Sequence, residues 1–298
     1  MSKVSVAILG SGNIGTDLLV KIQRSEYLEC KLFAGRSLSS KGMARAISLG
    51  ATVSDEGIDA IVKNPDCCTL VFDATSAKDA EHHFEVLREL GKVVINMTPA
   101  KIGTFCIPAV DLNYAAEQRY FNMVTCGGQA SIPIAYVIGQ IYPKMEYIEV
   151  VSSISSYSAG PATRLNLDEY IETTEEALRI FSGAKKTKSI LILNPAIPCI
   201  DMQTTIFASV ANPDMRKLTI AINSMVKTIS SYVPGYRLLF SPIYRDGHII
   251  VMIRVQGNGD YLPKYAGNLD IINCAAIAVA ERYAKNTAVV TAANFEAR

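Results

Sequence analysis

The first 120 or so residues of the chain alternate between short apolar runs and longer segments with helical spacing. Five apolar runs have the length and residue types of buried parallel strands: residues 4–9, 30–35, 69–73, 92–96 and 121–125. Three amphipathic segments between them predict helices: residues 16–24, 41–49 and 77–90. Such alternation predicts an α/β domain in which helices cover both faces of a parallel sheet.

From about residue 145 the pattern changes, and strands outnumber helices. Five segments are predicted as strands: residues 147–155, 189–193, 204–210, 237–243 and 248–256. Helices predicted over residues 167–181 and 215–232 interrupt them, and Asp246-Gly247 is a hairpin turn signal. We therefore expect an α+β domain with a largely antiparallel sheet and helices on one face. An alanine-rich helix over residues 270–283 is expected to pack back on the first domain.

The first apolar run leads directly into a glycine-rich segment, Gly10-Ser11-Gly12-Asn13-Ile14-Gly15, which a helical segment follows. This is the context that a dinucleotide-binding fingerprint requires. Gly10 would make the tight turn, Gly12 would admit the pyrophosphate, and Gly15 would let helix and strand pack closely. The phosphates would lie at the helix N-terminus, which predicts a Rossmann-type, doubly wound sheet.

The ends of later strands complete the expected cofactor cleft. Ligands of open α/β sheets bind beyond the carboxyl ends of the strands. We therefore expect residues 73–76, among them Thr75 and Ser76, together with residues 96–99, to line the cleft. The dinucleotide-binding domain would comprise residues 1–125, completed by a C-terminal helix over residues 269–298, and the second domain would comprise residues 126–268.

Cys126 lies between a predicted strand and a predicted helix that resumes at Gln129. A helix N-terminus favours thiolate over thiol, and Gly127 and Gly128 would let another molecule approach the sulfur closely. The alternative is a small buried cysteine beside a tight turn. Together with a dinucleotide site, the cysteine favours an oxidoreductase that acts on aldehydes.

Composition narrows the class of protein. The chain has 298 residues, 49% of them hydrophobic, and a net charge of +1, which gives no reason to expect a nucleic-acid or membrane partner. No signal peptide is recognisable at the N-terminus. The seven cysteines show no C-x-x-C pair, so we expect no metal site and a reducing, cytoplasmic location.

Several segments resemble one family nearly end to end: residues 72–76, 97–100, 123–130, 158–164, 194–196 and 259–270. The chain resembles the bacterial acylating acetaldehyde dehydrogenases, the coenzyme A-dependent partners of 4-hydroxy-2-oxovalerate aldolase, as a divergent member. The resemblance implies a homodimer, an aldolase partner, and a second domain that carries catalysis and dimerisation. Its small-molecule substrates would be an aldehyde and an acyl-CoA.

The resemblance also implies residue roles. Cys126 would be the acyl-thioester nucleophile, and hydride would pass between its adduct and a nicotinamide cofactor before coenzyme A takes the acyl group, or the reverse. Donors near the helix N-terminus would steady the oxyanion. Implied cofactor contacts, besides residues 11–14, are Ser158, Ala159, Gly160, Pro161, Ala162, Thr163, Arg164, Asn166 and Asn268. The 158–166 segment could instead be a plain structural turn, and Asn268 a helix N-cap.

The chain departs from the family at Thr204, where members usually carry an aspartate. Threonine cannot act as a base near neutral pH. Asp201 lies at an odd offset and would face the other side of the strand, while His82 and His83 are expected on a surface helix, and His248 at the start of a strand. We therefore expect acyl-CoA reduction, which depends less on such a base, to dominate at neutral pH.

A second departure follows the strand over residues 30–35. Family members commonly have Gly-Ile-Asp-Pro there, and this chain has Gly35-Arg36-Ser37. Without the acid, and with Arg36 and Ser37 as donors, NADP(H) is favoured over NAD(H). The alternative is a solvated loop.

Two other functions remain open from the sequence. An acyl-phosphate semialdehyde dehydrogenase would need phosphate-binding and histidine groups, for which Arg164 and His248 are the candidates. A catalytically silent, cofactor-binding partner of an aldolase would explain Thr204, and the intact Cys126 segment is the evidence against it.

Overall fold

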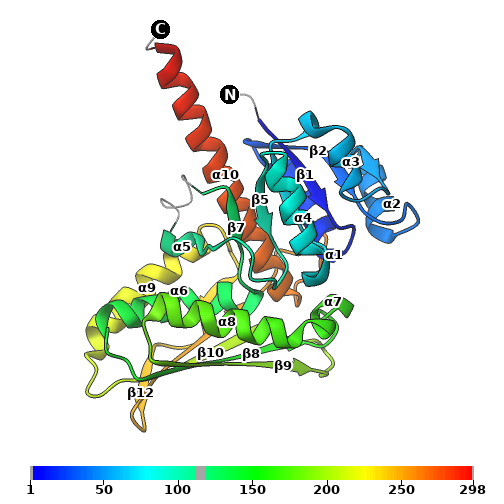
Figure 1. Cartoon of the computed structure of the whole chain (residues 1–298). Helices are drawn as coiled ribbons and strands as arrows, with labels where there is room; N and C mark the ends of the chain where they lie inside the picture. The colour runs from blue at the N-terminus through cyan, green and yellow to red at the C-terminus, as the bar shows by residue number, and fades with distance from the viewer. Residues whose placement is uncertain (1–2, 112–117, 297–298) are drawn as a thin grey trace. The chain divides into compact units, whose positions relative to one another are not determined.

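The computed structural model describes residues 3–111 and 118–296. The chain folds into two compact units (Figure 1). The first comprises Met1–Met123 and Asn273–Arg298, and the second comprises Val124–Ile272. The last helix, α10 (Gly267–Glu296), begins in the second unit and continues in the first. None of the helices within the described residues is long and apolar enough to cross a membrane.

A seven-stranded sheet with the order β3-β2-β1-β4-β5-β7-β6 forms the centre of the first unit. Its strands are β1 (Val4–Leu9), β2 (Leu28–Ala34), β3 (Val53–Ser54), β4 (Leu70–Asp73), β5 (Val93–Asn96), β6 (Thr104–Phe105) and β7 (Tyr120–Asn122). All neighbouring strands pair in parallel. The chain winds in one direction from β1 to β2 and in the other to β4, which confirms the predicted doubly wound α/β sheet.

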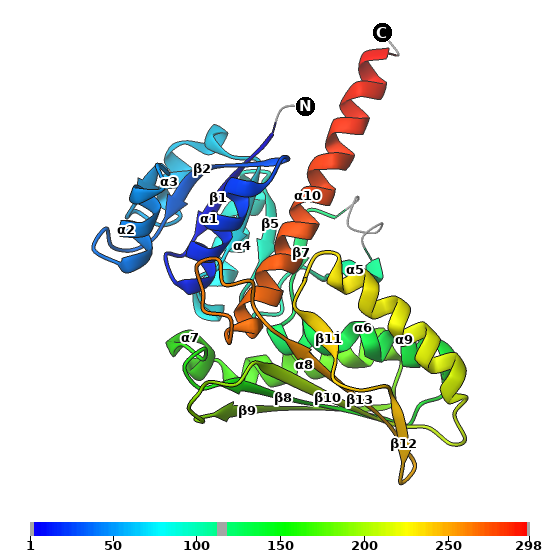
Figure 2. The same cartoon turned by 180° about the vertical axis from the view of Figure 1, so that it is seen from behind.

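Helices lie on both faces of this sheet, and for that reason β4 and β5 are buried along their whole length. Figure 1 shows α4 (Ala77–Glu89) in front of the strands, and Figure 2, from behind, shows α1 (Asn13–Arg24) in front of them. The shorter helices are α2 (Lys41–Ser48), α3 (Asp59–Lys63), the 3-10 turn η1 (Pro65–Cys67) and α5 (Pro108–Asp111). The sequence did not predict β3, β6, α3 or α5, because elements of two to five residues are too short to show a period.

Asn273 anchors the part of α10 that belongs to the first unit. Its side-chain Nδ2 donates to the Asp17 carboxylate at 2.8 Å and to the carbonyl of Ile14 at 3.3 Å. Asp17 also pairs with Lys21 at 3.1 Å, and all three side chains are buried. The last helix is therefore attached to α1 by buried hydrogen bonds from Asn273 Nδ2, while Asn273 Oδ1 has no partner among the described residues.

The second unit contains a six-stranded sheet with the order β11-β13-β10-β8-β9, and β12 pairs with β13. Its strands are β8 (Tyr147–Ser155), β9 (Lys186–Asn194), β10 (Met202–Ser209), β11 (Tyr236–Leu238), β12 (Ile243–Arg245) and β13 (His248–Val255). Only β8 and β9 pair in parallel, so the sheet is largely antiparallel, as predicted. The single strand expected over residues 237–243 is wrong. Pro242, which has no N–H to donate, lies between the two strands that replace it.

Three long helices, α6 (Cys126–Ile141), α8 (Leu167–Ser182) and α9 (Met215–Ser230), lie on one face of this sheet (Figure 1). Side chains alternate across the strands, and those that face the helices, such as Val150, Ile206 and Val251, are buried. The opposite positions are half-buried or exposed, and seven of them are apolar: Val151, Ile190, Ile192, Phe207, Ile243, Ile250 and Met252. We name this set the helix-free apolar face.

Candidate active site

The glycine-rich turn after β1 packs against the segment that follows β4. Gly10 has a φ of +110°, and a Cβ there would lie 2.4 Å from the carbonyl oxygen of Ala74. A Cβ at Gly15 would lie 1.9 Å from the carbonyl oxygen of Gly10. Both positions therefore require glycine. At Gly12, by contrast, no atom of the described residues lies within 4 Å of the Cβ position.

Helix α1 begins at Asn13, three positions before the predicted start. Within the described residues, no side chain makes a capping hydrogen bond at its N-terminus. The first backbone N–H groups of the helix, at Asn13, Ile14 and Gly15, are therefore free of a side-chain cap and can receive an anion. With the open space at Gly12, this arrangement fits the pyrophosphate of a dinucleotide.

Arg36 and Ser37 follow β2 and are both exposed. No ion pair joins Arg36 to another residue in the described part of the chain, and the Ser37 hydroxyl lies 2.8 Å from that of Ser39. The same loop contacts the glycine-rich turn, because the Ser40 hydroxyl donates to the Ser11 hydroxyl at 3.1 Å. Arg36 is therefore a cation without an ion-pair partner among the described residues, and its loop contacts the glycine-rich turn.

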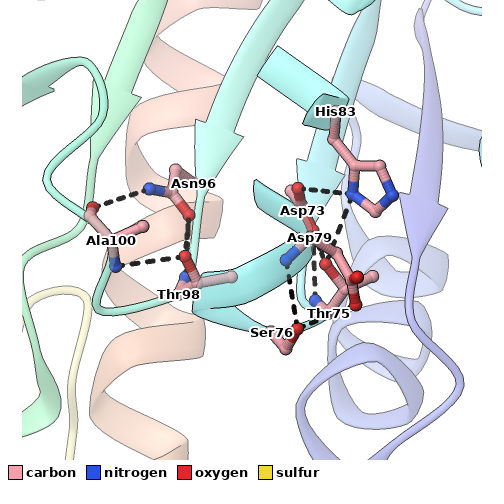
Figure 3. Close-up of polar contacts among 8 residues, drawn as sticks. All are labelled: Asp73, Thr75, Ser76, Asp79, His83, Asn96, Thr98 and Ala100. Atoms are coloured by element: carbon pink, nitrogen blue, oxygen red, sulfur yellow. Dashed lines mark hydrogen bonds and ion pairs between the residues drawn. The ribbon is translucent and has the colours of Figure 1, made fainter. Parts of the chain in front are cut away.

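Asp73, at the end of β4, organises a group of side chains beside that turn (Figure 3). Its carboxylate accepts from the Thr75 backbone N–H at 3.1 Å and from the Thr75 hydroxyl, and lies 3.0 Å from Nδ1 of His83. Burial lowers the pKa of His83, but the hydrogen bond and charge of Asp73, with the charge of Asp79, outweigh it and raise that pKa. His83 lies on a surface helix, as expected, but its own side chain is only 12% exposed.

The neighbouring turns are also held by their own side chains (Figure 3). Ser76 caps α4, since its hydroxyl accepts from the Asp79 N–H at 3.3 Å and donates to the Asp79 carboxylate at 2.7 Å. After β5, Asn96 Oδ1 accepts from the N–H of Thr98 at 2.9 Å and from its hydroxyl at 2.7 Å, and Asn96 Nδ2 donates to the Ala100 carbonyl at 3.1 Å. These side chains stabilise the turns, which leaves mainly backbone groups to line a cleft.

Cys126 is the first residue of α6. The expected strand over residues 121–125 ends at Asn122, because Val124 has a φ of +59° and turns the chain. The hydroxyl of Thr125 caps the helix and accepts from the N–H of Gly128 at 2.9 Å. The thiol is half-buried at this N-terminus.

The two glycines after Cys126 make room for protein groups. A Cβ at Gly127 would lie 2.1 Å from the hydroxyl oxygen of Tyr170, and a Cβ at Gly128 would lie 2.7 Å from Cγ1 of Val124. These glycines therefore have a role within the protein itself, and the expected approach of another molecule to the sulfur stays a prediction. They let α8 and the preceding turn approach the start of α6.

Burial raises the pKa of the Cys126 thiol above its ordinary value, and hydrogen bonds with Tyr170 and with the backbone N–H groups of Gly127 and Cys126 lower it only in part. We expected the helix N-terminus to favour the thiolate, and the net direction is the opposite. Burial destabilises the thiolate more than the hydrogen bonds at the helix N-terminus stabilise it. Attack by Cys126 should therefore accelerate as the pH rises above neutrality.

Tyr170, in α8, is the site residue that the sequence did not reveal. It is 6% exposed, and its hydroxyl accepts from the Gly127 N–H at 3.0 Å and lies 3.8 Å from the sulfur of Cys126. One turn later, the hydroxyl of Thr174 lies 2.7 Å from that of Thr125. The spacing of Tyr170 and Thr174 on one helix face was the available signal, but nothing local ties that face to Cys126.

Thr204 is buried on β10, and its hydroxyl lies 2.9 Å from that of Ser152. The Asp201 carboxylate precedes the strand and accepts from Gln256 at 3.4 Å. His248 places Nδ1 2.8 Å from the carbonyl of Asp246, within its own hairpin. Thr204, where the resemblance led us to expect an aspartate, is therefore part of a pair of hydroxyl groups.

The segment expected to contact the cofactor contains a short helix, α7 (Pro161–Leu165), and Gly160, Ala162 and Thr163 belong to its start. Ser158 is buried, and its hydroxyl donates to the carbonyl of Ser155 at 2.8 Å. The Arg164 guanidinium donates to the carbonyls of Ala159 at 3.1 Å and Ser156 at 3.0 Å.

The Asn166 side chain does not cap the helix that follows it. The hydrogen bonds of Ser158 and Arg164 close their own loop. The alternative of a structural turn is consistent with those bonds.

Asn268 is 1% exposed and lies inside the first turn of α10, so it is not the N-cap. Its Oδ1 has no hydrogen-bond partner among the described residues. A buried amide oxygen without a hydrogen-bond partner lowers the stability of the fold. Such an oxygen can accept a hydrogen bond from the N–H of a bound amide group. The described residues contain no cluster of three or more His, Cys, Asp or Glu suited to a metal ion.

Comparisons with known proteins point to one family. A family model described as prokaryotic acetaldehyde dehydrogenase, dimerisation, matches residues 126–263. The chain is 60% identical over 282 residues to the acetaldehyde dehydrogenase of Spirochaeta aurantia, covering 95% of each. It is 58% identical over 281 residues to that of Pectobacterium atrosepticum, covering 94% of this chain and 95% of the relative.

Solved structures show the same fold. The aspartate semialdehyde dehydrogenase of Candida albicans, solved with NADP, matches with a TM-score of 0.64 at 12% identity and covers 96% of this chain and 99% of that one. Aspartate semialdehyde dehydrogenase II of Vibrio cholerae matches with a TM-score of 0.61 at 14% identity, with the same coverage. At these identities the likeness concerns the fold alone.

Two alanine substitutions should separate folding from ligand binding in the glycine-rich turn. Gly15→Ala places a methyl group against the Gly10 carbonyl and should lower stability by about 1–3 kcal/mol or more, measured by thermal unfolding. Gly12→Ala, the matched control, has space for its methyl and should keep the unfolding midpoint. It should weaken dinucleotide binding in a fluorescence titration, because the methyl occupies the space that the pyrophosphate needs. Unchanged binding by Gly12→Ala would contradict the assignment.

Proposed function

Because the chain belongs to the acetaldehyde dehydrogenase family, we propose that it interconverts an aldehyde and an acyl-CoA through a thioester on Cys126. It is an oxidoreductase that acts on the aldehyde group with a nicotinamide cofactor. The observation that carries the proposed role of Cys126 is the half-buried thiol at the start of α6, within hydrogen-bond range of a hydroxyl group. A thiol held in this way can form and release an acyl group.

The described residues fit the cofactor. In the first unit, the uncapped N-terminus of α1 and the open space at Gly12 would receive the pyrophosphate. In the second unit, the unpartnered Oδ1 of Asn268 would accept from an amide such as that of nicotinamide. When bound, the cofactor supplies or accepts the hydride.

We favour NADP(H) over NAD(H). Arg36 is exposed at the carboxyl end of β2, without an ion-pair partner among the described residues. The Ser37 and Ser39 hydroxyls beside it add donors. A ribose 2′-phosphate would find charge-assisted hydrogen bonds here.

Acyl-CoA reduction is the proposed direction. No carboxylate stands at Thr204, whose hydroxyl is paired with that of Ser152. Oxidative acylation must deprotonate coenzyme A, whereas reduction releases coenzyme A as a thiolate, which can leave without a base. The aldehyde formed would suit an aldolase partner.

The acyl-phosphate alternative loses its candidate residues. Arg164 donates to the carbonyls of its own loop, and His248 is bonded within its hairpin. The remaining alternative, a catalytically silent subunit, would be excluded if acetyl-CoA acylates Cys126.

The match to a dimerisation domain supports a homodimer. We propose that a second copy of the chain covers the helix-free apolar face, since Phe207 and Ile250 lie side by side there and exposed apolar patches mark interaction sites.

Incubation with acetyl-CoA and no reductant should acylate Cys126, detected by mass spectrometry of peptides. Cys126→Ala should lower aldehyde formation by several orders of magnitude, since the alanine cannot form a thioester. Cys199→Ser is the matched control at another half-buried cysteine and should keep activity. Near-normal activity of Cys126→Ala would refute the thioester.

Arg36→Ile combined with Ser37→Asp should move preference from NADPH toward NADH. A hydrogen bond to a charged group contributes about 1.5–3 kcal/mol, equivalent to roughly 10- to 150-fold in the Kd for NADPH. Arg45→Gln, which removes an exposed cation from α2, should leave the ratio unchanged. Tighter binding of NADH than NADPH by the wild type would contradict the preference.

Phe207→Lys should convert the dimer into a monomer in light scattering, because the lysine charge would be buried at the interface. Ile220→Lys, on the exposed side of α9, should leave the mass unchanged. A dimeric Phe207→Lys protein would place the interface elsewhere.

A further inference from the structure

The Tyr170 hydroxyl is the one side-chain hydrogen-bond partner of the Cys126 sulfur within the described part of the second unit, at 3.8 Å. We infer that Tyr170 is a catalytic residue whose O–H donates to this sulfur once the thiol has ionised and so stabilises the thiolate that attacks. The inference rests on the proposed role of Cys126.

The ionisation state of Cys126 sets the direction of the bond: the thiol donates its S–H to the Tyr170 oxygen at 3.8 Å, whereas the thiolate has no proton to donate and must accept from the O–H. The Tyr170 oxygen accepts from the Gly127 N–H at 3.0 Å, which leaves the single hydroxyl proton to point elsewhere. The sulfur of Cys126 lies in range of that proton. Once the thiol has ionised, the O–H···S bond becomes charge-assisted and stronger, so the tyrosine favours the thiolate over the thiol.

Tyr170 acts as a donor and not as a base. Burial raises the pKa of Tyr170 well above its ordinary value, and the charge of the Cys126 thiolate raises it further. The hydroxyl therefore keeps its proton throughout the range in which Cys126 ionises. A group that stays protonated can support the thiolate but cannot remove its proton.

The hydroxyl is held in place before any substrate binds. The ring is buried, and the hydroxyl lies where only glycine is possible at position 127. Thr174, one turn along α8, is fixed by hydrogen bonds to Thr125 at 2.7 Å and to the Tyr170 carbonyl at 2.7 Å. A donor fixed in this way needs no reorganisation during the reaction.

The backbone groups nearest the sulfur are already engaged. The N–H of Gly127 binds the Tyr170 hydroxyl, and the N–H of Gly128 binds the Thr125 hydroxyl. The expectation that these helix N–H groups steady the oxyanion is therefore not met by either of them. The Gly127 N–H also polarises the tyrosine hydroxyl, so part of its effect on the sulfur passes through that hydroxyl.

The decisive test follows alkylation of Cys126 by iodoacetamide, because this reaction reports thiolate content without cofactor or acyl-CoA. Tyr170→Phe keeps the ring and removes the hydroxyl. The pH at which the alkylation rate of Cys126 reaches half its maximum, the midpoint, should be about one unit higher in Tyr170→Phe than in the wild type. Alkylation of the variant should be about tenfold slower below the midpoint and equally fast well above it. The acylation rate with acetyl-CoA should fall by the same factor.

Tyr142→Phe is the matched control. Tyr142 stands at the opposite end of α6, and its hydroxyl accepts from the Asp214 N–H at 2.8 Å. This substitution also removes a tyrosine hydroxyl that accepts a backbone N–H at one end of α6, but it should leave the alkylation profile of Cys126 unchanged. A shared midpoint for wild type and Tyr170→Phe would overturn the inference.

Protein with 3-fluorotyrosine in place of tyrosine provides a test that needs no substitution at position 170. A more acidic phenol is a stronger donor, so the midpoint for Cys126 should move down in the wild type and stay fixed in Tyr170→Phe. No movement in the wild type would also overturn the inference. Failure of acetyl-CoA to acylate Cys126 would instead refute the proposed function, and the alkylation profile would still measure the role of Tyr170.

Discussion

The first turn of α6 is the constraint on which the second unit depends. A helix N-terminus leaves backbone N–H groups without partners inside the helix, and here hydroxyl groups satisfy two of them: Thr125 binds the N–H of Gly128 and Tyr170 binds that of Gly127. The second bond requires glycine at position 127, because any Cβ would meet the tyrosine hydroxyl. Satisfying the helix end therefore also brings an O–H group to the sulfur of Cys126.

The first unit follows the same rule at the carboxyl edge of its sheet. Glycine at positions 10 and 15 permits close backbone contacts, while the Asp73 carboxylate fixes Thr75 and His83. Each turn is held by side chains that bond to it, and loops held on a rigid sheet are suited to binding. Gly12 has open space at its Cβ position directly before the uncapped N-terminus of α1, and the two features together make it the place that we propose for a ligand.

Elements with a long, regular pattern could be predicted from the sequence, and contacts between distant residues could not. β1 and the glycine-rich turn form one local signal, and the alternation of strands and helices led to the doubly wound sheet. Tyr170 lies 44 positions from Cys126, and no local pattern relates the two. Glycine at position 127 did indicate a close approach, but a sequence cannot say whether a ligand or another helix makes it. The depth of burial at Cys126 and His83 was likewise hidden, because it depends on which surfaces pack together.

Burial acts on both of these groups in the direction that disfavours charge, and their partners decide the outcome. Asp73 is charged and outweighs burial at His83, whereas Tyr170 is neutral and offsets burial at Cys126 only in part. A carboxylate at position 204 could take up a proton, but its negative charge would disfavour a nearby thiolate. A hydroxyl does the reverse, since it supports a thiolate and accepts no proton near neutral pH. A site built from Tyr170 and Thr204 is therefore better suited to attack on an acyl-CoA, whose leaving thiolate needs no base, than to the deprotonation of coenzyme A.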